Sequence, residues 1–518
     1  MTTRPARFLA TAAATAAFLV PLAHAAEVRH LTVAFGAEPT QIDPTRISAG
    51  VDQYFVSLFY EQLLASDPEL DRVNRLAESW ELRERNGVFA YHVRLRQGVR
   101  FHNGDELTAE DLRYAFERQS DPQASRLASR WRYVDRVDVI DDYTFEIVFS
   151  TPDSALVSLN LDLWAVPRRY YEEVGDEGVV AHPIGTGPWK FVSRRVREEI
   201  VLERFEDYWD AEHKPSADRL TIKIIPEDTT RVAAFKTGAV DWIDAVPPAQ
   251  IDEIEAMPGV EVVSLPTPNN LFLAMSASDP KSPFADTRVR QAVAHAFDVD
   301  AIIEYILYGQ GVRTAQLAPG EIGYDPGLEP YAFDVAKSRQ LLRSAGYPRG
   351  FNVNCYNLTT PREPYMKQIG EAIFSYLIEA GIRCRIVQLE YGAWINLGRR
   401  NARPKMDGIA SWMWGHGLPG DPSDAWSGHL HSAGEGWGPY SYHSDEELDA
   451  LVEELRTTMD PTEKDALVRR IARLKHERVA GGLPTYRPLV TFAWRDKVTF
   501  RAWPMASWRD MREIGLRD

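Results

Sequence analysis

The sequence predicts an α/β protein with two or three domains. Predicted strands and helices alternate along the whole chain, which is the pattern of α/β architecture. Residues 351–358, 369–380 and 382–389 have the patterns of a strand, a helix and a strand, and such a unit implies a parallel strand pair. The roughly 490 residues that follow the N-terminal leader are more than one hydrophobic core normally accommodates, so two or three domains are expected.

The N-terminal half is predicted to begin with a strand and a helix. In the helix, Phe55, Leu58, Phe59 and Leu63 recur at helical spacing, which places them on one apolar face. The predicted elements of this half are a strand at 30–34, a helix at 51–64, a strand at 88–95, a helix opening at Thr108, a hairpin at 137–149 and strands at 201–204 and 220–225.

The C-terminal half is predicted to be rich in helices. Two helices are expected at 288–297 and 301–308, before the strand–helix–strand unit. After that unit, Ser444 and Glu447 have the spacing of a capping box at the start of a helix. A second helix is expected to start at Asp460-Pro461, because proline is tolerated in the first helical turn.

The first 25 residues have the features of a secretory signal peptide. Arg4 and Arg7 form a basic region, Phe8–Val20 is apolar, Pro21 ends that run, and Ala23-His24-Ala25 suits signal peptidase. The apolar run is shorter than the roughly 20 residues that a membrane-spanning helix needs. No cysteine lies near the cleavage point, so a cleaved export signal without a lipid anchor is expected.

The charge balance excludes several classes of partner. The formal net charge is −16, and loss of the two leader arginines makes the mature chain more negative still. Such a chain repels phosphate backbones and anionic lipids. A nucleic acid or a membrane surface is therefore not an expected partner.

Only two cysteines occur, Cys355 and Cys384. Two thiolates are too few for a structural zinc cage. Each cysteine sits in an alternating apolar pattern, so the interpretation that we favour is two buried small hydrophobic side chains. Export also permits a disulfide, which stays open as the alternative.

Two common hydrolase motifs are absent from the sequence. Neither a GxSxG nucleophile turn nor an HExxH zinc motif occurs, and His476-Glu477 lacks the second histidine. The acid pair Asp241/Asp244 is interpreted as turn residues rather than as a glycosidase pair. We therefore expect a protein that is not an enzyme and that carries no cofactor.

Eight motifs, in order along the chain, resemble one family. It is the bacterial extracellular solute-binding proteins of the oligopeptide, dipeptide and nickel group, which serve ABC importers. The motifs are Arg75–Trp80, Tyr91–Gly104, Leu107–Leu112, Pro183–Phe191, Tyr208-Trp209, Phe235–Asp241, Arg288–Asp298 and Ala336–Pro348. Most of their residues have a structural interpretation as core, turn or cap, so the motifs indicate the fold and leave the ligand open.

The resemblance implies a two-lobed periplasmic-binding-protein fold of type II, a venus-flytrap, with an extra domain inserted in the first lobe. Ligand would bind between the lobes, which close by hinge rotation. Pro266–Asn270 is expected to cross the hinge. The implied boundaries are a signal peptide at 1–25, lobe one at 26–58, 185–268 and 488–518, the inserted domain at 59–184, and lobe two at 269–487.

Two groups of residues in lobe one and at the hinge are candidate ligand contacts. In the turn Ile184–Pro188, Gly187 allows close approach of a ligand to the backbone, and Thr186 offers a hydroxyl. A tight turn without ligand contact is the alternative. By resemblance, Gln53 and Tyr54 correspond loosely to an N-terminal contact loop, and Asn270 to a hinge contact.

The segment Ser411–Pro422 is the strongest candidate in lobe two. It contains Trp412, Trp414, His416 and Asp421 together with three glycines. By resemblance, peptide-binding relatives carry here an Asp that pairs with the α-ammonium of the peptide. The segment Trp414-Gly415-His416 stands where that Asp is expected, while the second acidic element remains as Asp421-Pro422. A core position for one of the two tryptophans is the alternative.

Arg362 follows the strand that ends at residue 358, where the family has a loop facing the cleft. Its guanidinium suits a carboxylate, and a solvated pair with Glu363 is the alternative. Metal binding is a rival because imidazole is a common ligand of nickel and zinc, and His416, His429, His431 and His443 lie close in sequence. No known ligand spacing matches that set.

The expected function is reversible capture of a small solute in the periplasm, most simply a peptide or peptide-like compound. The expected partners are a cognate ABC permease with its ATPase subunits, and the protein is expected to be a monomer. Without an acidic ammonium anchor, an opine, an oligosaccharide, an aromatic solute or a metal chelate stays open as ligand. A sensor role shares the same fold, and a secreted hydrolase is the enzyme alternative.

Overall fold

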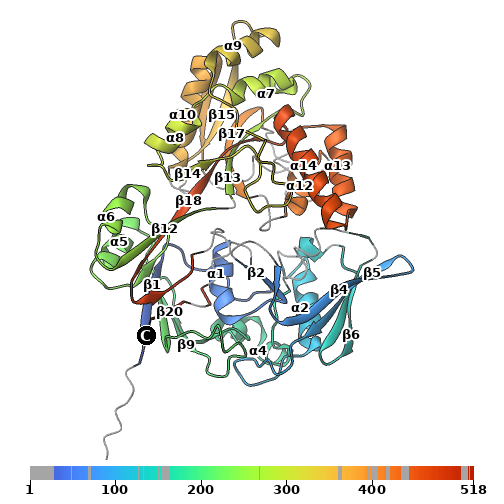
Figure 1. The fold of residues 1–518 in the computed structure, drawn as a ribbon, viewed down its shortest axis with the longest axis vertical. Coiled ribbons are helices and arrows are strands. Elements are labelled where there is room, and N and C mark those ends of the chain that lie inside the picture. The colour runs from blue at the N-terminus through green and yellow to red at the C-terminus, as the bar shows by residue number, and fades with distance from the viewer. Residues whose placement is uncertain are drawn as a thin grey trace, which may run out of the picture.

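The fold is organised around one long strand, β18 (Leu483–Arg495), which runs through the junction of two bodies (Figure 1). Its first half pairs with β13 (Asn269–Met275) and β14 (Gly311–Arg313) in the upper body. Its second half pairs with β11 (Trp242–Ile243) and β12 (Val260–Pro266) in the lower body. The sheets of the two bodies are thus joined through one shared strand.

The computed structural model describes part of the chain. The described residues are 28–47, 50–67, 72–125, 128–131, 133–149, 151–152, 154, 163–267, 269–359, 365–390, 393, 397, 406–415, 421–432, 443–502, 511–512 and 514–517. Among these residues, no helix combines the length and the apolar character that crossing a membrane requires.

Lobe one is the part of the lower body built on β1 (His30–Phe35). This strand is parallel to β11 on one side and to β10 on the other. The sheet continues antiparallel through β10, β9 and β8, and α1 packs on β8. The other elements of lobe one are α1 (Gly50–Phe59), β8 (Trp189–Arg195), β9 (Glu199–Arg204), β10 (Arg219–Ile224), α5 (Asp228–Lys236), α6 (Ile251–Glu255), β19 (Val498–Thr499) and β20 (Gly515–Leu516).

The inserted domain carries an antiparallel sheet in the order β4-β5-β7-β6, with α2 packed against β6. The predicted strand at 88–95 and the predicted hairpin at 137–149 are confirmed as β5 and as β6 with β7. The elements are β2 (Leu64–Ser66), β3 (Arg72–Asn74), β4 (Ala77–Arg85), β5 (Val88–Leu95), α2 (Ala109–Ser120), β6 (Arg136–Asp141), β7 (Thr144–Phe149) and α4 (Arg168–Ala181).

Lobe two is the upper body. The predicted strand–helix–strand unit is confirmed, because β15 (Phe351–Leu358) and β16 (Ile382–Leu389) are parallel and α10 (Met366–Ala380) connects them. The sheet order is β16-β15-β17-β13-β18. The remaining elements are α7 (Thr287–Ala294), α8 (Val299–Tyr305), α9 (Val335–Ser344), β17 (Gly408–Gly415), α12 (Ser423–His429), α13 (Glu446–Thr457) and α14 (Pro461–Arg478).

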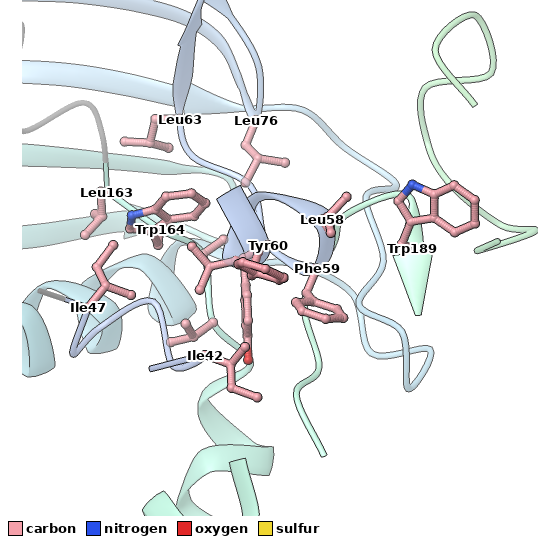
Figure 2. Packing of buried hydrophobic residues seen from close by; sticks show 14 of the residues in the cluster. Ile42, Ile47, Leu58, Phe59, Tyr60, Leu63, Leu76, Leu163, Trp164 and Trp189 are labelled. Atoms are coloured by element: carbon pink, nitrogen blue, oxygen red, sulfur yellow. The ribbon is translucent and has the colours of Figure 1, made fainter. Parts of the chain in front are cut away.

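The helix predicted at 51–64 is shorter than its apolar spacing indicates. It ends at Phe59, because the carbonyl of Phe59 accepts a hydrogen bond from the Gly187 N–H at 2.8 Å and Leu64 enters β2. Tyr60 and Leu63 belong to the same hydrophobic cluster as Leu76 and Trp164 (Figure 2). These two predicted helix positions are therefore core positions reached after the helix has ended.

Helix capping agrees with the sequence at Thr108, the N-cap of α2, and at one of the two sites predicted in the C-terminal half. Asp460 caps α14 by accepting from the N–H groups of Thr462 and Glu463, and Pro461 occupies the first turn as predicted. At α13 the cap is Asp445 rather than the predicted Ser444, because the Asp445 carboxylate accepts from the Leu448 N–H at 3.2 Å. Asp445 also pairs with Arg478 at 2.8 Å, which fixes its position.

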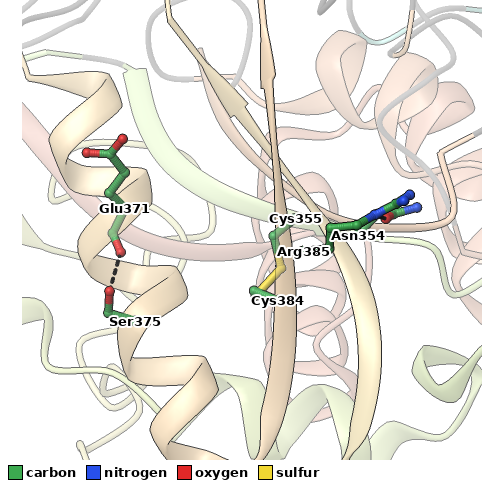
Figure 3. The surroundings of a disulfide bond; sticks show 6 residues. All are labelled: Asn354, Cys355, Glu371, Ser375, Cys384 and Arg385. Atoms are coloured by element: carbon green, nitrogen blue, oxygen red, sulfur yellow. Dashed lines mark hydrogen bonds between the residues drawn. A yellow bond between two sulfur atoms is a disulfide. The ribbon is translucent and has the colours of Figure 1, made fainter.

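The two cysteines form a disulfide, so the favoured interpretation of two free buried thiols is wrong. The bond joins β15 to β16 within lobe two (Figure 3), with the Cα atoms 5.4 Å apart. The parallel register pairs Cys355 with Ile386 and Val353 with Cys384, so the cysteines are diagonal neighbours. Two alternating strands do not reveal their relative register, and the sequence therefore left this proximity open.

Candidate functional site

The predicted contact turn at 184–188 is buried within the lower body. Thr186 is fully buried, and its hydroxyl donates to Glu61 Oε2 at 3.0 Å. A Cβ on Gly187 would lie 2.6 Å from the Leu58 carbonyl oxygen, so glycine is needed here for backbone packing. The close approach that the sequence predicted is therefore made to the chain's own backbone at the end of α1.

Glu61 forms the centre of this buried contact. Its carboxylate also accepts from Arg75 Nε at 3.0 Å, from the Tyr208 hydroxyl at 2.8 Å and from Trp209 Nε1 at 2.8 Å. A buried carboxylate is costly unless hydrogen bonds and a cation compensate it, and this one has both. The cluster joins the start of the inserted domain to lobe one, which accounts for Thr186 without a ligand.

Gln53 and Tyr54 lie on α1, on the side of the lower body that faces lobe two (Figure 1). Both side chains are half-buried, and the Tyr54 ring stacks on Phe35 with centroids 6.5 Å apart. Both residues thus keep part of their surface exposed on a helix that borders the junction of the two bodies.

Asn270, Trp412 and Trp414 are brought together by strand pairing at the lobe-two side of the junction. Asn270 of β13 is opposite Trp414 of β17, and Phe272 is opposite Trp412. Asn270 is buried, and its amide donates to the Gln316 carbonyl at 3.5 Å. The structure describes the backbone of the two tryptophans, while His416 and Arg362 lie outside the described residues.

Asp421 is buried and paired. Its carboxylate accepts from Lys464 Nζ at 2.6 Å and from the Ser423 N–H at 2.9 Å. Burial opposes ionisation, yet Lys464 and the Ser423 bonds together hold the pKa of Asp421 below its usual value. The carboxylate thus already has its counterion, and a ligand ammonium would have to compete with Lys464 for it.

An aromatic pair at the rim of lobe two was not singled out from the sequence. The rings of Tyr308 and Tyr365 lie 6.2 Å apart, and both residues have positive φ angles. Burial, Tyr308 and Asp228 together raise the pKa of Tyr365. Asp228 begins α5 of lobe one, so Tyr365 lies within electrostatic range of that lobe. The signal in the sequence was weak, since Tyr365 simply follows the Arg362 loop.

A cavity of about 310 Å³ lies beside the hinge strand in lobe two. Arg487 of β18 lines it, and forms a buried ion pair with Glu321 at 2.7 Å. Apolar residues supply much of the rest, including Pro266, Leu317 and Ala472. The ion pair ties the loop that follows β14 to the strand that both bodies share.

Two of the four clustered histidines, His431 and His443, have described side chains, and their surroundings differ. His431 Nε2 lies 3.2 Å from a carboxylate oxygen of Glu453. His443 is buried, and burial together with Lys475 lowers its pKa to about 4. Within the described residues no three metal-ligating side chains come together, and His416 lies outside them.

Comparison with known proteins gives concordant results. The family model described as "Bacterial extracellular solute-binding proteins, family 5 Middle" matches residues 72–437. The chain is 28% identical over 394 residues to the glutathione-binding protein GsiB of Pectobacterium atrosepticum, with 74% of each chain covered. It is 29% identical over 431 residues to heme-binding protein A of Haemophilus influenzae, covering 78% of this chain and 77% of that one.

A solved structure matches over nearly the whole chain. The periplasmic binding protein DppA of Helicobacter pylori, in complex with the peptide STSA, superposes with a TM-score of 0.77 at 24% identity. The superposition covers 94% of this chain and 98% of that one. This likeness confirms the predicted two-lobed α/β fold.

Proposed function

Because this chain belongs to the bacterial extracellular solute-binding proteins of family 5, we propose that it captures a short peptide or a peptide-like compound between its lobes. The loaded protein would deliver this solute to the permease of an ABC importer. Reversible binding without chemical change, no cofactor, a monomeric state and a cleaved export signal without a lipid anchor are parts of the same proposal.

The observation that carries the proposal is the shared strand β18. It pairs with lobe-two strands through residues 483–488 and with lobe-one strands through 489–495. The described chain also passes between the lobes from β12 to β13, around residue 267. Two adjacent strands can bend together while the lobes stay rigid, which is the geometry of hinge closure.

The proposed ligand contacts lie on both sides of this junction. Gln53 and Tyr54 of α1 belong to lobe one. Asn270, Trp412 and Trp414 belong to the β13–β17 pair of lobe two. We include His416 and Arg362 in the proposed site by sequence. Thr186 and Gly187, which are buried at Glu61, are better explained as packing.

The ion pair of Asp421 with Lys464 favours a peptide-like ligand whose binding does not depend on an ammonium group. Its carboxylate is engaged by Lys464, so recognition would rest on backbone groups, aromatic faces and the Arg362 guanidinium. Glutathione is the first compound to test, because the name of one relative gives it as the ligand. The same Asp421–Lys464 pair also favours an alternative ligand without an ammonium anchor. Such a ligand would be an opine, an oligosaccharide, an aromatic solute such as haem, or a metal chelate.

Native mass spectrometry of the protein purified from its host tests the proposal directly, because a retained solute reveals its own mass. Isothermal titration with glutathione, a tetrapeptide, haem, an opine and a nickel–histidine complex then measures affinity. We expect one of the peptide-like probes to bind in the micromolar range or tighter, about −8 kcal/mol or better. Chemical conversion of a probe, or binding of the non-peptide probes alone, would contradict it.

A further inference from the structure

The inserted domain contacts lobe two through Ser154, a residue that belongs neither to β18 nor to the β12–β13 crossing. Ser154 of the inserted domain is almost completely buried there. Its N–H donates to the Arg456 carbonyl and its hydroxyl to the Leu455 carbonyl, each at 2.7 Å. Both carbonyls belong to the last turn of α13, where helix carbonyls have no partner within the helix. Ser154 therefore caps a lobe-two helix from the other side of the junction.

A second residue of the inserted domain supports this contact. The Arg456 guanidinium carbon lies 3.7 Å from the centre of the Tyr133 ring, in the arrangement of a cation–π pair. Tyr133 lies between the short 3-10 helix η1 (Ala128–Trp131) and β6, and Arg456 is in the last turn of α13. The backbone bonds of Ser154 and the ring of Tyr133 thus bind the same helix end.

Lys464 connects this contact to the candidate ligand segment. Its ammonium donates to the Ser154 carbonyl at 2.7 Å and to Asp421 Oδ2 at 2.6 Å. Lys464 and Asp421 are both buried. Separation of the lobes would take the Ser154 carbonyl away from the ammonium. A buried ion pair is stable only when its other hydrogen bonds are satisfied, and the Ser154 carbonyl satisfies one donor of Lys464. Separation of the lobes is therefore coupled to the Lys464–Asp421 ion pair.

We propose that Ser154, Tyr133, Arg456 and Lys464 form an interlobe latch that keeps the lobes closed in a measurable fraction of ligand-free molecules. Lys464 is the positioning residue of this latch, because its ammonium bonds both to Ser154 of the inserted domain and to Asp421 of lobe two. The inference rests on the proposed function in one respect, that capture occurs by lobe closure. A populated closed state sets the apparent affinity of any ligand that binds only that state.

Single-molecule energy transfer between dyes on Glu84→Cys in β4 and Ala450→Cys in α13 measures closure without any ligand. Both sites are exposed, and the native disulfide leaves no other free thiol. We expect a closed population in the otherwise unchanged protein. The double variant Tyr133→Leu/Ser154→Ala removes the Tyr133 ring from Arg456 and the Ser154 hydroxyl from the Leu455 carbonyl, and it leaves the backbone bonds of Ser154 in place. Loss of these two side-chain contacts should lower the closed-to-open ratio about fivefold or more.

A matched control comes from lobe one. Lys236 pairs with Glu253 at 2.5 Å inside that lobe, so Lys236→Met removes an ion pair of a lysine without touching the latch. It should leave the closed-to-open ratio unchanged. Lys464→Met should lower the ratio at least as far as the double variant. If Lys464→Met does not fold by circular dichroism, because Asp421 is left unpaired, the result with Tyr133→Leu/Ser154→Ala decides.

The absence of a closed population in the ligand-free protein would overturn the latch. A closed population that stays the same in Tyr133→Leu/Ser154→Ala would overturn it equally. Titration of the labelled wild type with glutathione separates this result from the proposed function. Closure by glutathione with no change between latch variants would reject the latch and keep the function. A latch effect without any response to glutathione would support the latch and count against that ligand.

Discussion

At the scale of single residues, the structure assigns buried polar groups to partners that the sequence does not reveal. Thr186 was predicted to contact ligand from a glycine-rich turn, and its hydroxyl instead meets Glu61. Asp421 was chosen as an acidic ligand contact, and it is paired with Lys464, which is 43 positions away in the chain. Sequence spacing identifies local turns and caps, whereas these partners come from distant elements.

Thr186→Val tests whether this residue is structural. The variant leaves Glu61 with one donor fewer in a buried position, and we expect the free energy of unfolding to fall by about 1–3 kcal/mol. Ligand affinity should stay within a factor of about two, since the side chain is fully buried. Urea denaturation and calorimetric titration measure the two quantities.

Thr237→Val, at an exposed helix end, serves as the control with little change in stability. A large loss of affinity with unchanged stability would restore Thr186 as a ligand contact.

Two histidines with lowered pKa values, the partly buried His102 and the buried His443, predict a loss of stability in mild acid. Burial lowers the pKa of both His102 and His443 to about 4. Between the ordinary pKa of 6.5 and that value, the unfolded chain binds protons that the folded chain does not. The free energy of unfolding therefore falls as pH falls through this window, by about 1.4 kcal/mol per pH unit for each histidine.

The pH effect is separable by substitution. His443→Leu should reduce the loss measured by urea denaturation between pH 6.5 and pH 5, and His102→Leu/His443→Leu should reduce it further, while His30, His295 and His476, whose pKa values are also lowered by burial, account for part of the remainder. His443 lies among charged groups of α13, α14 and the preceding residues, including Lys475, Asp445 and Asp449. An unchanged pH slope in the double variant would assign the loss to those groups instead.

At the scale of elements, the strongest sequence patterns gave the best predictions. β5, the β6–β7 hairpin and the β15–α10–β16 unit follow from alternation, a turn and a helical period, all of which are local. The helix at 51–64 was predicted too long, because its apolar face continues into core positions after the backbone leaves the helix at Phe59. The pairing of Cys355 with Cys384 depends on strand register, which local patterns do not contain.

The disulfide should stabilise lobe two by restricting its unfolded chain. The bond closes a loop between residues 29 positions apart, for which a stabilisation of about 2–4 kcal/mol is usual. Cys355→Ala/Cys384→Ala should lower the free energy of unfolding by that amount, as measured by urea denaturation. Wild type treated with a reductant should match the variant, whereas reductant should have no effect on the variant itself. Equal stability of all three samples would show that the bond contributes nothing.

At the scale of the whole molecule, β18 joins what would otherwise be two separate folding units. Its residues pair with β13 and β14 in lobe two and with β11 and β12 in lobe one. Lobe one is also completed by the last strands of the chain, β19 and β20, which follow β18. The overall architecture was accessible from sequence because eight family motifs occur in order, while the contact between inserted domain and lobe two depends on Ser154, which no motif marked.

The shared strand predicts that the two lobes unfold together, and Arg487 tests this. Arg487→Met leaves Glu321 buried without its counterion, which should cost about 3–5 kcal/mol. Because β18 continues into lobe one, calorimetry should record one transition at a lower temperature, and amide exchange should accelerate in β11 and β12 as well as in β13. The matched variant Glu321→Gln/Arg487→Met removes both charges and should recover most of the loss. Two separated transitions, with only the lobe-two signal lowered, would mean that the hinge strand transmits rotation between the lobes without coupling their stabilities.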